Sequence, residues 1–296
     1  MKTAYTIIEE NNIKTIFLFF LYGIIFAFLG FIIYFITNEI FISLFIFAYA
    51  FFYSFLNILF GDRLLLWLTE AKKMDRSKYE DVYRMVENLS IAAGLPKIPE
   101  VYLIEIKDMN AFAIGSLGEN YKVVLTEGII KNLDKNELEG VIAHEISHIK
   151  NKDTKIMTRA VLLAGAISII TEIFLRSLGS NSRNKGGSFI LLIIIITSIL
   201  APLFASLIKF AISRKREFIA DSSAALLTRD PLSLASALEK VSKSSQQNLQ
   251  NVQQIAALCI VSPFKGKGFI NKIINNLFST HPPVEERIKI LKSMVI

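Results

Sequence analysis

The sequence of 296 residues contains only one cysteine and three histidines. The lone cysteine, Cys259, excludes an internal disulfide and a structural zinc site built on cysteine pairs. The formal net charge is +7, yet no aromatic and basic stripe or nucleic-acid-binding module accompanies it, so we expect no nucleic-acid partner. No small-x-small cleavage site follows the first apolar run, which is too long for the core of a signal peptide. We therefore expect this run to stay in place as an anchor.

Apolar residues are what the sequence has in excess, at 52% of the chain, and they occur in blocks. The runs 15–36 and 40–60 contain no charged residue, and a helix needs about 20 such residues to cross the hydrocarbon core of a membrane. Two later runs, 160–175 and 189–212, are a third and a fourth candidate. Because the third is short and contains Glu172, a buried core helix is the alternative for it. The sequence thus predicts an integral membrane protein with about four transmembrane helices.

Basic residues gather where these runs meet water: one group follows the second run and another surrounds the end of the fourth, namely Lys72, Lys73, Arg76, Lys209, Arg214, Lys215 and Arg216. Cytoplasmic loops carry an excess of Lys and Arg, so residues 61 to about 156 are expected to face the cytoplasm. The loop 176–188 does not fit this orientation. It is basic, but the order of the spans places it on the side of the membrane opposite the cytoplasm. We therefore expect four parts: an N-terminal transmembrane hairpin (1–60), a cytoplasmic part (61–156), a second hydrophobic hairpin (157–212) and a second cytoplasmic part (213–296).

The polar parts mix helix and strand signals. An amphipathic helix is expected over 77–93 and should end at Gly94. The runs 101–106, 110–114 and 121–126 have strand character, and together they predict a small antiparallel sheet. Further helix starts are indicated at Asp134, where the D-x-x-E spacing can form a capping box with Glu137, and at Asp230-Pro231. The fold class expected is α+β and mostly helical.

The helix that begins near Asp134 contains His144-Glu145-Ile146-Ser147-His148. Histidines four residues apart project from one face of a helix, so His144 and His148 can bind one metal ion together. Glu145 falls on the apolar stripe of that helix, where a carboxylate is costly unless it has a partner. Zinc with three protein ligands keeps a position for water, and an adjacent carboxylate can remove its proton, so Glu145 is the candidate general base. The alternative is a chance match on a surface helix.

A third ligand has to come from elsewhere in the chain. His281 is the only other histidine, so a carboxylate is the natural candidate, and Glu217 stands out in Ser-Arg-Lys-Arg-Glu-Phe-Ile-Ala-Asp. Two spans between His148 and Glu217 would return the chain to the same membrane face. Asp221, four residues after Glu217, could accept the outer N–H of a ligating histidine. The alternative for Glu217 is a plain charged residue at a basic helix end.

Three motifs in this order resemble the HtpX family of membrane zinc endopeptidases: His-Glu-Ile-Ser-His at 144–148, the segment 213–221, and Ser-Thr-His-Pro-Pro at 279–283 with Glu286-Arg287. The resemblance covers nearly the whole chain. It implies a zincin-like domain with one Zn²⁺ per chain, held by His144, His148 and Glu217, with Glu145 as the catalytic base. It also implies a multi-pass protein of the cell membrane that cleaves misfolded or damaged membrane proteins on the cytoplasmic side.

The resemblance suggests roles for five more residues. His281 is similar to a family histidine near the metal that could stabilise the oxyanion, with a surface histidine as the alternative. Arg287 could orient Glu217, Asp221 or a substrate carbonyl. Asn110, Ala111 and Phe112 match a family pattern whose strand edge pairs with the substrate backbone, and the alternative for Asn110 is a turn residue.

Three other functions compete with this one. A CAAX prenyl protease shares the metal motifs, but those proteins resemble a larger barrel of about seven spans. A catalytically silent membrane scaffold could retain the helix, although the presence of Glu145 and all three histidines argues against it. A transporter with an intramembrane acid at Glu172 would leave the two polar motifs unexplained. The sequence says nothing of the oligomeric state.

Overall fold

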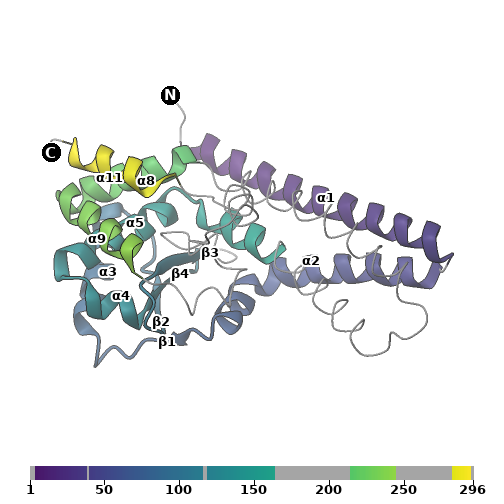
Figure 1. Cartoon of the computed structure of the whole chain (residues 1–296), viewed down its shortest axis with the longest axis horizontal. Helices are drawn as coiled ribbons and strands as arrows, with labels where there is room; N and C mark the ends of the chain where they lie inside the picture. Colours follow the sequence, from purple (N-terminus) through teal and green to yellow (C-terminus); the bar gives the residue numbers. More distant parts are fainter. Residues whose placement is uncertain (1–3, 39, 116–118, 164–213, 245–281, 295–296) are drawn as a thin grey trace.

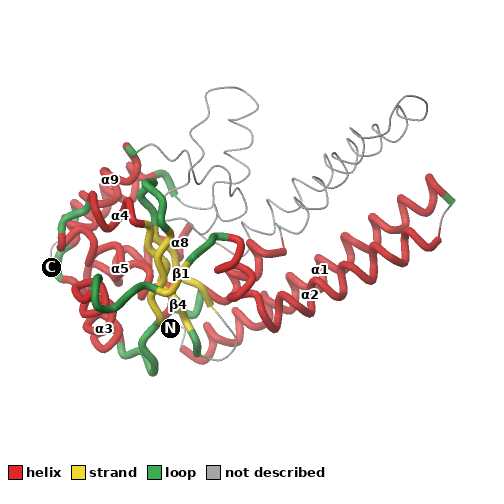
Figure 2. The backbone as a smooth tube through the Cα atoms, turned by 90° about the horizontal axis from the view of Figure 1, so that it is seen from below, coloured by secondary structure: helices red, strands yellow, loops and turns green. Residues whose placement is uncertain are grey.

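The computed structural model describes residues 4–38, 40–115, 119–163, 214–244 and 282–294. This part of the chain consists of two long helices that lie side by side and a compact region in which helices surround a sheet (Figures 1 and 2). Except for 160–163, the third and fourth apolar runs lie outside the described residues, as do Glu172 and the loop 176–188.

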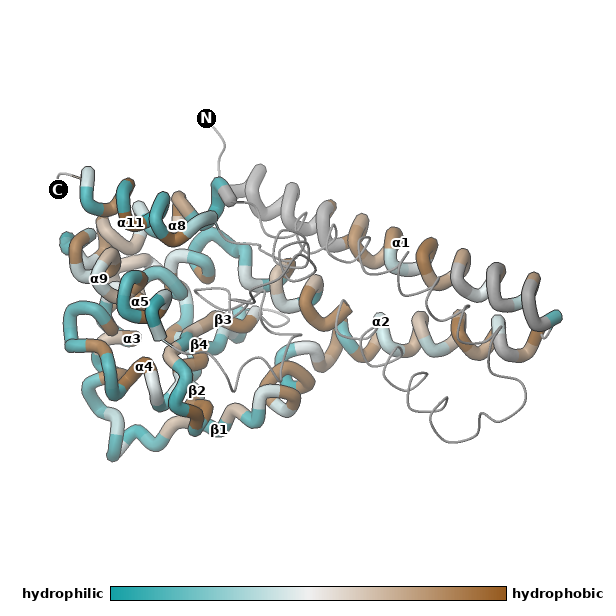
Figure 3. Tube along the Cα trace, viewed as in Figure 1, coloured by the Kyte–Doolittle hydropathy of each residue, from teal (hydrophilic) through white to brown (hydrophobic). Residues whose placement is uncertain are grey.

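The two long helices are α1 (Ala4–Thr37) and α2 (Ile40–Leu68), and they extend away from the compact region. Apolar residues recur along the coloured parts of both helices (Figure 3), and the exposed ones include Phe20, Phe35 and Phe45. Within the described residues, one helix, Ser43–Leu68, is long and apolar enough to cross a membrane, and Ile16–Phe28 is a shorter apolar stretch. The first two predicted apolar helices are therefore present.

The sheet has the strand order β1-β2-β4-β3, formed by Lys72–Lys73, Glu100–Ile104, Tyr121–Thr126 and Ala111–Gly115 respectively. The prediction of an antiparallel sheet is wrong for its central pair, because β2 and β4 run parallel, with Val101 opposite Val123. The chain forms β3 at the outer edge before it returns as β4 between β2 and β3. Strand periodicity reports which residues are extended but not which strand becomes the neighbour. The sheet is therefore mixed.

Both faces of the sheet are covered, which explains why all six residues of β4 are buried. Val123 and Leu125 belong to a core shared with helices of the compact region, whereas Val124 belongs to a second core with α1, α2 and residues 156–163. Successive side chains of a strand point to opposite faces. The sheet thus joins the apolar helix pair directly to the rest of the molecule.

The helices of the compact region begin and end largely where the sequence predicts. Helix α3 (Glu80–Ala93) ends at Gly94, whose φ of 71° lies in the left-handed region that glycine tolerates. Helix α4 (Glu127–Asn132) follows β4, and α9 (Pro231–Lys243) begins after Asp230, which caps it. The remaining helices are α5 (Lys135–Lys150), α8 (Arg214–Thr228) and α11 (Val284–Lys292). Helix α5 packs against α3, α8, α9 and the sheet.

The start of α5 is held by the predicted capping box. The Asp134 carboxylate accepts from the backbone N–H of Glu137, and the Glu137 carboxylate accepts from the backbone N–H of Asp134, both at 3.0 Å. Glu137 also accepts hydrogen bonds from Ser236 and Lys240 of α9, each at 2.6 Å. The cap therefore fixes α5 both to its own first turn and to a neighbouring helix.

We expect Asp134→Ala to lower the free energy of unfolding by about 1 kcal/mol, because it leaves a first-turn N–H without its acceptor. Thermal or denaturant unfolding of the detergent-solubilised protein measures this loss. Lys135→Ala, an exposed change one residue later, is the control and should stay within about 0.5 kcal/mol of the wild type. Equal stability of the two variants would contradict the role of the cap.

Candidate metal centre

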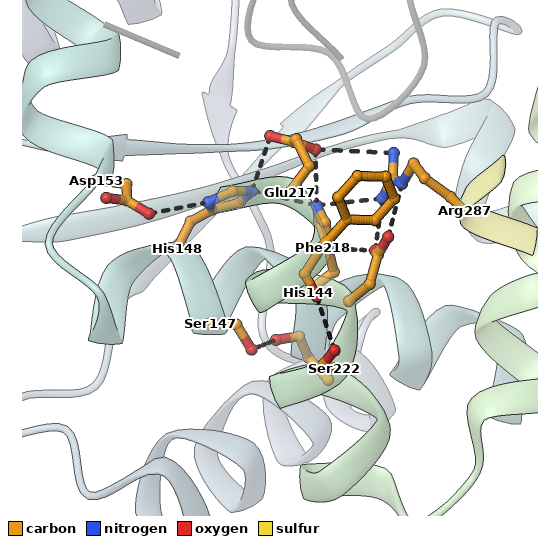
Figure 4. Close-up of polar contacts among 10 residues, drawn as sticks. His144, Ser147, His148, Asp153, Glu217, Phe218, Ser222 and Arg287 are labelled. Atoms are coloured by element: carbon orange, nitrogen blue, oxygen red, sulfur yellow. Dashed lines mark hydrogen bonds and ion pairs between the residues drawn. The ribbon is translucent and has the colours of Figure 1, made fainter. Parts of the chain in front are cut away.

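Helix α5 places His144 and His148 on one buried face, and each is at most 3% exposed. The two imidazole rings meet edge to face, and their Nε2 atoms lie 3.2 Å apart. Glu217 reaches the same point from the first turn of α8, with one carboxylate oxygen 3.7 Å from His144 Nε2 and the other 3.5 Å from His148 Nε2 (Figure 4). Two helices far apart in the sequence therefore bring three donor atoms together.

The three side chains suit a divalent metal. One ligand atom from each lies within 4.8 Å of the others, and all three residues are buried. Ligand atoms about 2.1 Å from a tetrahedral zinc ion are about 3.4 Å apart, close to the separations found between these donors. Two imidazole nitrogens and one carboxylate form a donor set that zinc accepts in catalytic sites. The residues present thus fit the metal that the resemblance implies.

Two further side chains, Asp221 and Arg287, lie behind His144. Oδ1 of Asp221 on α8 is 2.9 Å from Nδ1 of His144. Arg287 of α11 donates to both oxygens of Asp221, from Nε at 2.8 Å and from Nη2 at 2.7 Å. Its Nη1 is also 3.8 Å from a Glu217 oxygen, and the whole side chain is 0% exposed. Arg287 therefore contacts the carboxylates of α8 and completes a chain of contacts from α11 through α8 to α5.

His148 has a similar pair behind it, in Asp153 and Arg216. Oδ2 of Asp153 is 3.7 Å from Nδ1 of His148, and Arg216 donates from Nη1 to the other oxygen of Asp153 at 2.6 Å. Sequence reasoning assigned no role to Asp153 and attributed Arg216 to the basic end of a membrane span. The sequence signal available for Asp153 was its short spacing from His148, just past the end of α5.

Glu145 lies on α5 beside these ligands and faces the edge strand β3. The backbone N–H of Ala113 in that strand is near enough to influence the pKa of the carboxyl. Burial raises the pKa of Glu145 to about 7, against the lowering influence of His148, Arg287 and the Ala113 N–H. A carboxylate with such a pKa can both take up and release a proton near neutral pH.

The pKa values of the neighbouring groups follow from burial and charge. Burial lowers the pKa of His144 to about 4, although Asp221 opposes this shift. Burial also acts to lower the pKa of His148, but the carboxylates of Asp153, Glu217 and Glu145 outweigh it and raise the value to about 9. Burial acts to raise the pKa of Asp221, but Arg287 and His144 outweigh it and hold the pKa well below its usual range.

The charges of this cluster are unbalanced when both histidines are neutral. Among the described residues, the carboxylates of Glu145, Asp153, Glu217 and Asp221 lie in one cluster with the guanidinium groups of Arg216 and Arg287. These six side chains together carry a formal charge of −2, and a divalent cation carries the opposite charge. Metal binding at His148 Nε2 would release the proton that these carboxylates otherwise hold on the ring.

The structure brings most of the predicted site residues together. His144, Glu145, His148, Glu217, Asp221 and Arg287 form one buried cluster. Asn110 precedes the edge strand β3 that begins at Ala111, and its carbonyl and backbone N–H bond to Thr126 of β4. The side chains of Ala111 and Phe112 are buried in the two cores on either face of the sheet. His281 lies outside the described residues.

The chain is similar to known proteins along nearly its whole length. The model of Peptidase family M48 matches residues 76–295. A protease HtpX homolog of Dictyoglomus thermophilum is 40% identical over 296 residues, which covers 99% of this chain and 95% of that protein. A protease HtpX homolog of Tropheryma whipplei is 41% identical over 253 residues, 85% of each chain. Among solved structures, Ste24p of S. mikatae aligns with a TM-score of 0.49 and 16% identity over 97% of this chain and 67% of that one.

Proposed function

The chain belongs to peptidase family M48 and is a membrane-bound metalloprotease, and we propose that it is a zinc endopeptidase with His144, His148 and Glu217 as the metal ligands. The observation that supports this most directly is the convergence of these three buried side chains from α5 and α8 on one point. We propose one zinc ion per chain at that point. Glu145, adjacent to both histidines on α5, is the proposed catalytic base.

The metal and the protein would divide the chemistry between them. A zinc ion bound there supplies Lewis acidity, which lowers the pKa of a water molecule to about 7 and polarises a peptide carbonyl. Glu145 takes the proton of the attacking water and passes it to the leaving amine. Burial raises the pKa of this carboxyl, which supports its assignment as the group that takes up and releases the proton.

Asp221 and Arg287 are proposed to orient the ligands. Asp221 contacts Nδ1 of His144, which directs Nε2 of the same ring toward Glu217. A carboxylate behind a ligating histidine fixes its tautomer and its ring orientation. Arg287 holds Asp221 with two hydrogen bonds and lies near Glu217, so one guanidinium braces both acids of α8. We also propose that His281 stabilises the oxyanion that forms when water attacks the peptide carbonyl.

A peptide substrate is proposed to add to the edge of β3, next to Glu145. This strand ends the sheet order, and extended peptides add to open strand edges. The backbone N–H of Ala111 donates to the Asn110 side chain at 2.9 Å, and that of Gly115 donates to Thr158 at 3.0 Å. An incoming strand therefore has to replace these side-chain acceptors. Asn110, Ala111 and Phe112 remain the proposed substrate-contacting residues.

The membrane attachment supports a proposal for substrate and location. The sheet that carries β3 packs on one face against α1 and α2, so the site is tied to the apolar helices. We propose a multi-pass protein with the four parts 1–60, 61–156, 157–212 and 213–296, whose site faces the cytoplasm. The basic residues after α2, including Lys72, Lys73 and Arg76, support this orientation. The proposed substrates are misfolded or damaged membrane proteins.

Metal removal tests the proposed function. The purified protein should contain close to one zinc per chain, and it should cleave an unfolded protein such as casein. A zinc chelator should abolish cleavage, and added zinc should restore it, because the metal polarises the scissile carbonyl. A zinc-loaded protein without chelator-sensitive cleavage of casein or of an unfolded membrane protein would contradict the proposal. Cleavage of a prenylated CAAX peptide but not of unfolded protein would favour the prenyl-protease alternative.

A further inference from the structure

A buried carboxylate, that of Asp153, lies behind His148, on the far side of the ring from Glu217 (Figure 4). The Asp153 side chain is only 4% exposed and is 3.7 Å from Nδ1 of the histidine. Arg216, 17% exposed, donates to Asp153 at 2.6 Å. Burial of an aspartate beside an arginine is costly unless the two are well paired, and the short contact provides that pairing.

This arrangement repeats the one behind His144. There, Asp221 faces Nδ1 of the ring, and Arg287 holds the carboxylate. In both cases an aspartate stands between the outer ring nitrogen of a histidine and an arginine. The two aspartates come from different segments, since Asp221 lies on α8 whereas Asp153 follows α5. The match therefore does not arise from one repeated helical spacing.

The backbone directs Asp153 toward His148. Helix α5 ends at Lys150, and Lys152 adopts a φ of 58°, a left-handed conformation that is uncommon for a residue other than glycine. This turn lets the backbone N–H of Asp153 donate to the carbonyl oxygen of His148 at 3.1 Å. The bond is the one that closes a Schellman motif, which usually has glycine at its left-handed position. This backbone hydrogen bond holds Asp153 at the position from which its side chain approaches the His148 ring to 3.7 Å.

Arg216 is also the sequence neighbour of another proposed ligand. It immediately precedes Glu217 in the first turn of α8, so its contact with Asp153 ties the end of α5 to the beginning of α8. Residues 154–163, which follow Asp153, are helical and reach α2 through hydrogen bonds to Tyr53 and Asn57.

We propose that Asp153 and Arg216 are positioning residues for the metal ligand His148. Asp153 orients the His148 ring, and Arg216 holds Asp153 in place. This rests on the proposed function, in which His148 is a ligand. A ligating histidine usually directs its other nitrogen to a carboxylate, and loss of such a partner lowers metal affinity roughly 10- to 100-fold. In this role Asp153 and Arg216 act on catalysis through His148 and the metal.

Zinc affinity measured by competition with a chromophoric chelator tests this proposal. Asp153→Asn should weaken zinc binding roughly 10- to 100-fold and change the visible spectrum of the cobalt-substituted protein, which reports ligand geometry. Arg216→Gln should act in the same direction, and Arg216→Lys should restore part of the affinity. Because the two residues act through one contact, the double variant should lose less than the two single losses combined. Glu105→Gln, which breaks an exposed ion pair with Lys72, is the matched control.

Thermal unfolding of the metal-free proteins separates positioning from mere stabilisation. Variants that are less stable without metal but bind zinc with wild-type affinity and an unchanged cobalt spectrum would overturn the proposal. If Asp153→Asn does not fold, the comparison of Arg216→Gln with Arg216→Lys decides by the same criteria. A wild-type protein that binds no zinc would instead refute the proposed function, so the two failures are distinguishable.

Discussion

Replacing Glu145 by glutamine should lower the rate of peptide-bond cleavage about 100- to 10,000-fold while zinc stays bound. General acid and base groups contribute rate factors of this size, and an amide cannot take a proton from water. The substitution keeps the shape of the side chain and removes only its capacity to take up a proton.

The measurement is kcat for casein cleavage, taken together with the metal content of the same preparation. Glu139→Gln, the same change on the same helix at a half-buried position, is the matched control and should retain wild-type activity. Full activity of the Glu145→Gln variant would exclude Glu145 as the base. Loss of zinc from that variant would mean that Glu145 holds the metal, which also contradicts its proposed role.

Replacing Glu217 by glutamine should remove most of the bound zinc and, with it, the cleavage activity. An amide oxygen is a weaker ligand than a carboxylate, and the cluster also loses one negative charge. The loss of zinc affinity should exceed the roughly 10- to 100-fold expected for Asp153→Asn, because Glu217 is proposed to bind the metal itself. The order of the two effects therefore distinguishes a ligand from a residue that orients one.

Metal analysis after dialysis and chelator competition measure this loss. Glu239→Gln changes a partly exposed glutamate of α9 and should leave zinc binding unchanged. Arg287 keeps its two hydrogen bonds to Asp221 in the Glu217 variant, so the packing of α11 against α8 should survive. Retention of zinc by a folded Glu217→Gln variant would exclude Glu217 as a ligand.

Local signals predicted several elements well. The Asp134 to Glu137 spacing predicted a capping box, and Gly94 predicted the end of α3, because caps depend on a few neighbouring residues. The strand run 121–126 corresponds to β4. The parallel pairing of β2 with β4 was missed, because it depends on the path of the chain through β3 rather than on either strand.

In the candidate site, too, the local features could be predicted and the contacts between distant residues could not. His144, Glu145 and His148 could be found as a motif because one helical turn brings them together. Arg216 could not be interpreted, since its basic neighbours suit a membrane-flanking segment, whereas its partner Asp153 lies 63 residues away. The left-handed Lys152 that brings Asp153 to His148 also has no sequence signature, because lysine does not favour that conformation.

The sequence by itself therefore indicated the chemistry proposed for this protein, through the His144 to His148 motif on a capped helix, the apolar runs and the acid at Glu217. The motif and the apolar runs depend on local spacing or composition, which a single segment carries, whereas the choice of Glu217 depended on the two spans expected between it and His148. Only the tertiary structure decided how α5, α8 and α11 meet, which aspartate and arginine lie behind each histidine, and that the sheet packs against the apolar helices. These contacts join residues distant in sequence, and their formation depends on the burial of many side chains at once.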